Sequence, residues 1–286
     1  MYFSVGMLYS AQELLRFLNS NPKVVSPFSD SLKAFNNIAS AKIVFEICQK
    51  CEWVRLDLDG YLELTNKTDD ILADTPVEKI LRVQIQHLIE AYKPTWIPLL
   101  TRGRSEALKY LPVDVVQCLR EADLTTSYAD DVILWWDKIG KISRRTGRDE
   151  KIDVGRRGEK LSVDYERTRT QKEPKWQGFE NNFSGYDVLS IVDSENVNPL
   201  NIEVKTSNST WEVASFYISK NEWSVAKSSP NYVFHLWALI PKNKLYIVSK
   251  DVVETHVPSN NGEGTWESVE IPFSAVCQKD QTSFAN

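Results

Sequence analysis

A short polar stretch divides this chain into two halves with different sequence patterns. Residues 141–153 read KISRRTGRDEKID and consist mostly of polar and charged side chains. Stretches of this kind separate domains, and 286 residues are enough for two. We therefore predict a mainly helical recognition or interaction domain at residues 1–150, a second domain at 151–276, and a disordered tail at 277–286.

The first half is mostly helical in pattern and contains one hairpin. Residues 41–53 place Ile43, Val44 and Ile47 at helical spacing. Residues 54–65 (VRLDLDGYLELT) alternate around Asp59-Gly60, which is a hairpin signal. Helices followed by a hairpin are similar to a winged helix, a module that reads DNA; a helical domain that merely contains a hairpin is the alternative. Further helices are expected at residues 77–92, 104–110, 113–121 and 128–139.

The second half alternates between helix and strand patterns. Asp153 suits the N-cap of a helix that ends near Thr170. Strands are expected at residues 176–181, 185–192, 200–206, 232–240 and 244–248, with a helix at 219–228. This order predicts an α/β domain with a mixed sheet.

Two local pairs in the first half have a structural and a functional interpretation each. Cys48 and Cys51 form a C-x-x-C pair, but a zinc site needs two more ligands and the three histidines are isolated. We favour two cysteines one helical turn apart in a core. Trp135-Trp136 could stack on bases, although packing in a core or an interface is the commoner use of such a pair.

Composition and charge limit the cellular context. Hydrophobic residues make up 42% and charged residues 26%, and no run of eighteen apolar residues or signal-peptide pattern occurs. We expect a cytoplasmic protein without a membrane partner.

The net charge is -5, yet residues 138–175 hold 13 basic and 7 acidic side chains. This basic stretch is either a phosphate-binding footprint or a solvated helix face with a linker.

The strand expected at residues 200–206 carries the residues of chemical interest. Side chains alternate along a strand, so Ile202 and Val204 point into a core while Glu203 and Lys205 share the other face. A carboxylate and an ammonium on one face can be a simple ion pair. They can also hold a divalent cation and a water side by side, because Mg²⁺ takes oxygen ligands and a lysine can orient the water or neutralise phosphate charge.

Two further carboxylates can join this pair. Asp187 lies in the preceding strand, and a hairpin with a turn at residues 193–196 would bring it beside Glu203. Gly185, just upstream, would let another backbone approach. Glu159 lies early in the preceding helix, after Gly155-Arg156-Arg157-Gly158, whose glycines permit close helix packing.

Four segments in order resemble a known family: GRRGEKLS, GYDVLS, NIEVKTS and FYISKNEWSVAKSSPNYVFHLWAL. They resemble the C-terminal domain of the plant protein NO VEIN, which also occurs in bacterial defence and restriction proteins. That family is similar to the Mrr-like branch of the PD-(D/E)xK nucleases. The resemblance, over residues 154–254, implies that Asp187, Glu203 and Lys205 are the metal and catalytic residues and that Glu159 is an accessory metal ligand. Glu222 matches a recurrent position of the family; a helix N-terminal charge or a structural hydrogen bond is its alternative interpretation.

The chain departs from the wider nuclease pattern at Tyr186, which stands where proline usually precedes the aspartate. Other chemistries find no motif. The sequence has no G-x-x-x-x-G-K-[ST] phosphate loop and no G-x-S-x-G elbow, and its histidines are too sparse for an HNH nuclease.

These patterns together predict a Mg²⁺-dependent DNA endonuclease, with Mn²⁺ as a substitute metal, in a restriction or anti-phage system. Asp187, Glu203 and Glu159 bind the metal, and Lys205 positions the attacking water. Cutting both strands calls for a homodimer or a partner subunit. A non-catalytic DNA-binding or assembly subunit and an RNA nuclease are the alternatives. The expected contacts to the DNA backbone are Arg144, Arg145, Arg148, Arg156 and Arg157.

Overall fold

The computed structural model describes residues 3–21, 40–143, 149–259, 266–279 and 283–285. The chain divides into two compact units, residues 1–145 and residues 146–286, and the division lies within the polar stretch 141–153. None of the helices in the described ranges has both the length and the apolar character that crossing a membrane requires.

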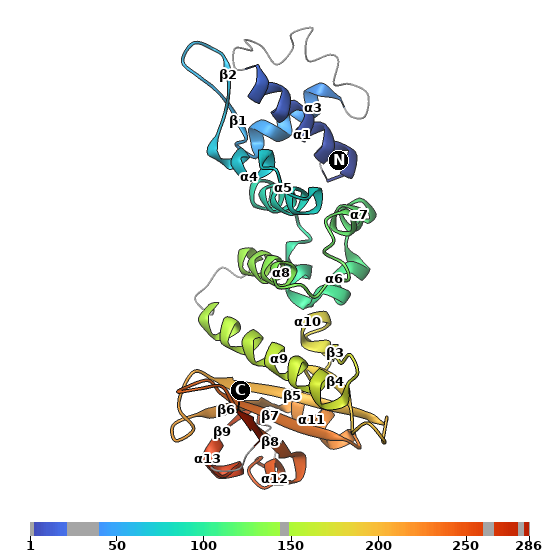
Figure 1. The fold of residues 1–286 in the computed structure, drawn as a ribbon, viewed down its shortest axis with the longest axis vertical. Coiled ribbons are helices and arrows are strands. Elements are labelled where there is room, and N and C mark those ends of the chain that lie inside the picture. Colours follow the sequence, from blue (N-terminus) through green and yellow to red (C-terminus); the bar gives the residue numbers. More distant parts are fainter. Residues whose placement is uncertain (1–2, 22–39, 144–148, 260–265, 280–282, 286) are drawn as a thin grey trace. The chain divides into compact units, whose positions relative to one another are not determined.

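The first unit is mainly helical, as predicted (Figure 1). Its helices are α1 (Val5–Ser20), α3 (Ala41–Lys50), α4 (Asp69–Leu72), α5 (Val77–Tyr92), α6 (Arg104–Tyr110), α7 (Val113–Glu121) and α8 (Asp130–Ser143), with short 3₁₀ turns η1 (Asn66–Thr68) and η2 (Ile97–Arg102). Proline helps set the boundaries, since Pro76 and Pro112 directly precede α5 and α7. After α5 the chain turns through Lys93 at φ 44° and then meets Pro94.

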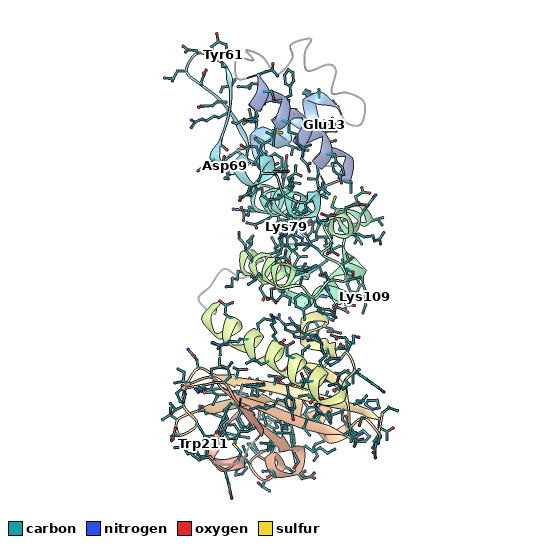
Figure 2. The ribbon with its side chains drawn as sticks, viewed as in Figure 1. Glu13, Tyr61, Asp69, Lys79, Lys109 and Trp211 are labelled. Carbon is teal, nitrogen blue, oxygen red and sulfur yellow. The ribbon has the colours of Figure 1, made fainter. Side chains whose placement is uncertain are left out.

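A hairpin follows α3 directly. β1 (Val54–Leu56) pairs antiparallel with β2 (Leu62–Leu64), so the predicted hairpin is confirmed. Its turn is closed by Asp57, whose Oδ1 accepts the N–H groups of Asp59 at 2.9 Å and Tyr61 at 2.7 Å (Tyr61 is labelled in Figure 2). Gly60 takes φ +82°, which an L side chain adopts with strain. Residues 22–39, between α1 and α3, lie outside the described residues, so the winged helix stays a prediction.

The two pairs singled out in the first half both lie in its core. Cys48 and Cys51 are buried free thiols, and burial raises the pKa of both, to about 12 for Cys51. Trp135 and Trp136 are buried too, and their indole N–H groups donate to the carbonyls of Arg82 at 3.0 Å and Leu124 at 2.9 Å. Core packing, the interpretation favoured for both pairs, is therefore confirmed.

The second unit is built on a mixed six-stranded sheet in the order β10-β8-β7-β5-β4-β3, which confirms the α/β prediction. β5 (Pro199–Ser207) runs parallel to β7 (Tyr232–Ala238), and the other pairs are antiparallel. The remaining strands are β3 (Lys175–Trp176), β4 (Val188–Ile191), β8 (Lys244–Ser249) and β10 (Ser283–Ala285). A second sheet, which the sequence did not predict, pairs β6 (Ser215–Ser219) with β9 (Ser268–Pro272).

Helices and the second sheet cover the two faces of the main sheet (Figure 1). α9 (Asp149–Thr170) lies on one face, where Ser162 Oγ meets Trp237 Nε1 at 2.8 Å and His235 Nδ1 at 3.2 Å. The opposite face belongs to a hydrophobic core that joins β7 to β6, β9 and α11 (Lys220–Ser228). α12 (Lys250–Glu254) and α13 (Phe273–Val276) complete this layer. The face of β5 that carries Glu203 and Lys205 is therefore covered rather than open to solvent.

Three expected elements differ from the structure. Residues 176–181 were expected as a strand, but after Trp176 the chain forms the short helix α10 (Gln177–Glu180). α9 begins at Asp149, before the expected cap at Asp153. The expected disordered tail begins at Cys277, which is buried, and β10 pairs with β8, whose edge would otherwise be unpaired.

Candidate active site

β4 and β5 form an antiparallel hairpin that brings Asp187 beside Glu203. Val188 pairs with Ile202, so Asp187, the residue before β4, faces the middle of β5. The Asp187 N–H donates to the Ile202 carbonyl at 2.9 Å, and Asp187 Oδ2 accepts the Val204 N–H at 2.8 Å. The predicted hairpin is confirmed, and the Asp187 carboxylate is bonded to the backbone next to Glu203.

The turn of this hairpin uses the predicted polar residues. Asp193 Oδ1 accepts the N–H groups of Glu195 at 2.9 Å and Asn196 at 2.7 Å. The Asp193 N–H donates to the Asn196 carbonyl at 3.1 Å. These bonds close the chain reversal and fix the register that places Asp187.

Glu159 reaches the hairpin from α9. Gly158 lies so close to β5 that a Cβ there would be 1.8 Å from Thr206 Oγ1, so the close helix packing expected at this glycine is confirmed. Glu159 Oε2 accepts hydrogen bonds from Trp176 Nε1 at 2.6 Å and from Arg156 Nη1 at 2.7 Å. The carboxylate therefore has a fixed place between α9 and the end of β3.

Gly178 brings the carboxylates of Glu159 and Asp187 together. A Cβ at this position would lie 2.7 Å from Asp187 Oδ1 and 2.9 Å from Glu159 Oε2. The Gly178 N–H also donates to the Asp187 carbonyl at 2.8 Å. Both carboxylates therefore lie against the place where Gly178 has only a hydrogen atom. The side chain of any other residue would occupy that place.

Lys205 lies between two carboxylates. Its ammonium is 2.8 Å from Glu203 Oε1 and 3.0 Å from Glu222 Oε1. The second oxygen of Glu222 accepts the Ser219 N–H at 2.7 Å and so closes the capping box of α11. The predicted neighbours Glu203 and Lys205 are thus in contact, and Glu222, from a different element, joins them.

Tyr232, at the start of β7, completes the surroundings of Glu203. Its hydroxyl donates to the Gly185 carbonyl at 2.8 Å and lies 3.4 Å from Glu203 Oε2. Gly185 has φ +73°, and a Cβ there would be 2.6 Å from Val225 Cγ2. The expected close approach at Gly185 therefore exists, but it is made by a side chain of α11 rather than by a backbone.

Burial and mutual repulsion shift the ionisation of these groups. Burial, followed by the charge of Glu159, raises the pKa of Asp187 to about 7. Burial and the charge of Asp187 raise the pKa of Glu203 well above its usual range. Burial alone would lower the pKa of Lys205, but Glu203 and Glu222 outweigh it and the net shift is upward. Burial opposes ionisation of Glu222 too, yet Lys205 holds its pKa below the usual value.

The charges of this cluster fit a divalent cation. The cluster has two cations, Lys205 and Arg156. It has four carboxylates, those of Glu159, Asp187, Glu203 and Glu222. Across the described part of the chain, no three His, Cys, Asp or Glu side chains form a group that would hold a metal by themselves. Mg²⁺ needs only one or two carboxylates besides water and substrate phosphate. The oxygens of Asp187 and Glu203 meet that smaller requirement.

The basic residues expected to contact DNA fall into three groups. Arg156 lies in the site itself, where its guanidinium also lies over the rings of Trp176 at 5.6 Å and Phe179 at 5.2 Å. Arg157 is exposed and donates to Asn243 Oδ1 at 3.0 Å. The third group, Arg144, Arg145 and Arg148, lies outside the residues that the structure describes.

Three residues of the site were not anticipated: Trp176, Gly178 and Tyr232. Trp176 holds Glu159, Gly178 makes room for two carboxylates, and Tyr232 lies against Glu203. Their neighbours in space come from other elements, so no spacing in the sequence marks them. Gly178 alone had a local signal, since a glycine within an expected strand indicates a close approach.

Comparison with known proteins supports the family resemblance for part of the chain. No curated protein and no solved structure matches the chain. Residues 158–248, about a third of the chain, match the family model described as Protein NO VEIN, C-terminal. The match lies within the predicted range 154–254 and includes Glu159, Asp187, Glu203, Lys205 and Glu222.

Proposed function

We propose that the second unit is a Mg²⁺-dependent nuclease centre of the PD-(D/E)xK type that hydrolyses phosphodiester bonds in DNA. The observation that carries this proposal is the meeting of Asp187 and Glu203 across the β4–β5 hairpin, with the Lys205 ammonium 2.8 Å from Glu203. An aspartate and a Glu-x-Lys pair on adjacent strands are the defining arrangement of that nuclease type. The match to the NO VEIN C-terminal model covers the same residues.

Asp187 and Glu203 would hold Mg²⁺, or Mn²⁺ in its place, and Glu159 stands beside Asp187 as a further oxygen ligand or through a water. When bound, the ion lowers the pKa of a coordinated water and stabilises negative charge on the phosphate. The protein's part is to keep the carboxylates in place. The Val204 N–H holds Asp187, and Trp176 and Arg156 hold Glu159.

Lys205 acts as a cation in this scheme. Its ammonium, flanked by Glu203 and Glu222, orients the attacking water and offsets charge as the phosphate becomes more negative. A water oxygen bonds to phosphorus as the bond from phosphorus to the leaving oxygen breaks, and the leaving oxygen takes its proton from solvent. The water's own proton passes to solvent. Arg156, which donates to Glu159 and lies over the rings of Trp176 and Phe179, would meet a phosphate of the backbone.

One such centre cuts one strand, so cleavage of a duplex requires a second copy of the chain or a partner subunit. The helical first unit would then select or position the duplex. The family resemblance suggests that the duplex is foreign DNA in a restriction or defence system.

The test is a cleavage assay with purified full-length protein. Supercoiled plasmid, linear duplex and single-stranded RNA are each incubated with Mg²⁺, Mn²⁺ or EDTA. Cleavage of DNA that depends on metal supports the proposal. Cleavage of RNA alone would assign the centre to RNA, and metal-independent binding without any cleavage would make the unit a binding subunit.

A further inference from the structure

We infer that Glu222 is a positioning residue that fixes the Lys205 ammonium at the reaction centre, and that α11 exists in part to present it. The inference rests on the proposed function only for the role that it assigns to Lys205. The contact itself is an independent feature of the fold. It connects β5 with the first turn of a helix that contributes no predicted metal ligand.

Glu222 uses its two oxygens for two different tasks. Oε2 accepts the Ser219 N–H at 2.7 Å, and Oε1 meets Lys205 Nζ at 3.0 Å. The first bond closes a capping box, which alone would account for a glutamate or a glutamine at this position. The second bond is not needed for capping. It points the remaining oxygen at the one cation of the Asp-Glu-Lys set.

α11 packs against the segment before β4, which also carries Asp187. Val225 packs against Gly185 so closely that a Cβ on residue 185 would be 2.6 Å from Val225 Cγ2. Trp223 is buried in the core on this face of the sheet. The capping box fixes the Glu222 side chain on a helix that packs against Gly185, two residues before Asp187, so the place of Lys205 is tied to the segment that carries Asp187.

The position of Lys205 depends on this second carboxylate because of side-chain freedom. A lysine has four rotatable side-chain bonds, and with Glu203 as its only partner the ammonium could move around that carboxylate. A second contact, with Glu222, restricts the ammonium to positions that satisfy both carboxylates. Since a misplacement of about 1 Å at a reacting centre can lower a rate by about 100-fold, the contact has a measurable consequence.

Glu222→Gln separates capping from positioning. Glutamine serves in a capping box, but it has one acceptor oxygen and a donor NH2 group where Glu222 has two acceptor oxygens and a charge, so it cannot offer separate oxygens to the Ser219 N–H and the Lys205 ammonium. We expect a protein that is folded at the assay temperature but has a lower melting temperature, a kcat about 100-fold lower and a KM for DNA within about twofold of the parent. Glu254→Gln is the matched control, because it also removes a glutamate charge from a lysine, Lys227 at 3.7 Å, but on the exposed surface of the same unit. It should leave kcat unchanged.

A second measurement makes the result independent of activity. Unfolding by urea is compared for Glu222→Gln, Lys205→Met and the double variant, all in the full-length chain. A non-zero coupling between the two substitutions is expected, and zero coupling would overturn the inference whether or not the protein cuts DNA. Coupling with an unchanged kcat in Glu222→Gln would overturn it as well. If the parent protein cuts no nucleic acid although the coupling is present, the proposed function fails and the Glu222–Lys205 contact stands.

Discussion

At the scale of single residues, burial separates the Glu203–Lys205 pair from an ordinary surface ion pair. An exposed Glu–Lys pair contributes about 0–1 kcal/mol to stability. Glu203, however, is only 3% exposed, and a second, partly buried carboxylate, Asp187, raises its pKa further. Burying charges costs free energy that packed apolar side chains would not cost. Stability is therefore a poor reason for this arrangement, and binding of a cation and a phosphate is a better one.

Substitution of Glu203 and Lys205 tests this argument directly. Glu203→Gln keeps the shape of the side chain but loses the charge that a Mg²⁺ ligand needs, and Lys205→Ala keeps both carboxylates. Both variants should cleave plasmid at least about 100-fold more slowly. Glu203→Gln should lose Mg²⁺ affinity yet bind DNA as well as the parent or better, whereas Lys205→Ala should still bind metal. Melting curves show whether each variant is folded at the assay temperature; normal cleavage by either folded variant would rule out the mechanism.

Gly178 gives a second test, of the carboxylate pair. In Gly178→Ala the new Cβ would meet Asp187 Oδ1 at 2.7 Å and Glu159 Oε2 at 2.9 Å, so one carboxylate must move. We expect weaker Mg²⁺ binding, measured by titration calorimetry, and cleavage slower by about tenfold or more. Mg²⁺ affinity equal to that of the parent would show that Glu159 and Asp187 need not stay close.

The sequence allowed the positions of some of these site residues to be predicted, but not those of others. Asp187, Glu203 and Lys205 could be predicted because strand alternation and one hairpin suffice to bring them together. The turn at residues 193–196 had recognisable chemistry as well. The contacts of Tyr232 could not be predicted, since they depend on the parallel pairing of β5 with β7, and the glycine at 178 indicated a close approach but not its partners, which depend on the path of α10. Such contacts between distant segments leave no local periodicity.

At the scale of elements, the approach of α9 to β5 positions Glu159. Gly158 has Thr206 against it, with Oγ1, Cβ and Cγ2 at 1.8, 2.9 and 3.1 Å from where a Cβ would stand, so rotation of the threonine cannot make room. Gly155, one turn earlier, has nothing within 4 Å. The two glycines of the segment GRRG thus differ in role, although the sequence presents them alike.

This difference predicts opposite effects of the same substitution. Gly158→Ala should lower the free energy of unfolding by about 1–3 kcal/mol through overpacking. It should also reduce cleavage, because α9 carries Glu159. Gly155→Ala should raise the free energy of unfolding by about 0.4–1 kcal/mol, since alanine restricts the unfolded chain. Urea denaturation of both variants measures the two effects, and equal effects would contradict the packing described at Gly158.

His235 lies under α9 and links stability to pH. Burial, followed by the charge of Arg169, lowers its pKa to about 3. Tyr165 packs edge-on at 5.6 Å between ring centroids, and Glu166 Oε1 is 3.8 Å from Nε2. The imidazole is therefore neutral in the folded state, whereas in the unfolded chain it takes up a proton below about pH 6.5. The stabilisation that comes from the neutral, buried imidazole is therefore complete above about pH 6.5 and is lost as the pH falls towards 3.

The expected loss is about 1.4 kcal/mol per pH unit below 6.5 from this residue alone. Other groups titrate over the same range, so the useful quantity is the difference between the parent and His235→Gln. Glutamine can still bond to Ser162, whose Oγ is 3.2 Å from the imidazole. Urea unfolding between about pH 7 and pH 5 should show a steeper decline in the parent. Parallel declines would mean that His235 is protonated in the folded protein.

In the second unit, the strands β4, β5, β7 and β8 and the helix α11 followed from periodicity, but the second sheet did not. β6 and β9 are five residues each and are separated by α11, β7, β8 and α12 in the chain. Their pairing covers the face of the main sheet that carries Glu203 and Lys205. A short strand that pairs with a distant one has too few alternations to identify it, so the cover on that face could not be predicted from the sequence.

At the scale of the whole molecule, the boundary between the two units determines where the chain can be divided. The first unit ends at Arg145, and α9 begins at Asp149. A fragment that starts at 146 keeps α9 whole with Gly158 and Glu159, whereas one that starts at 151 cuts its first turn. The arginines Arg144, Arg145 and Arg148 fall at this boundary, and binding through them should follow the rules for phosphate contacts.

Division of the chain tests how the work is shared between the units. We predict that residues 1–145 fold alone and bind duplex DNA, and that residues 146–286 retain weak, unselective cleavage that needs Mg²⁺. In the full-length chain, replacement of Arg144, Arg145 and Arg148 by alanine should lower affinity for all sequences alike and reduce the dependence of log K on log salt, by about 0.9 for each phosphate that is no longer neutralised. Fluorescence anisotropy at several salt concentrations measures both. If residues 1–145 bind no DNA but bind another protein, the winged-helix interpretation fails and the first unit is an assembly module; if the triple variant binds unchanged, the arginines belong to a linker.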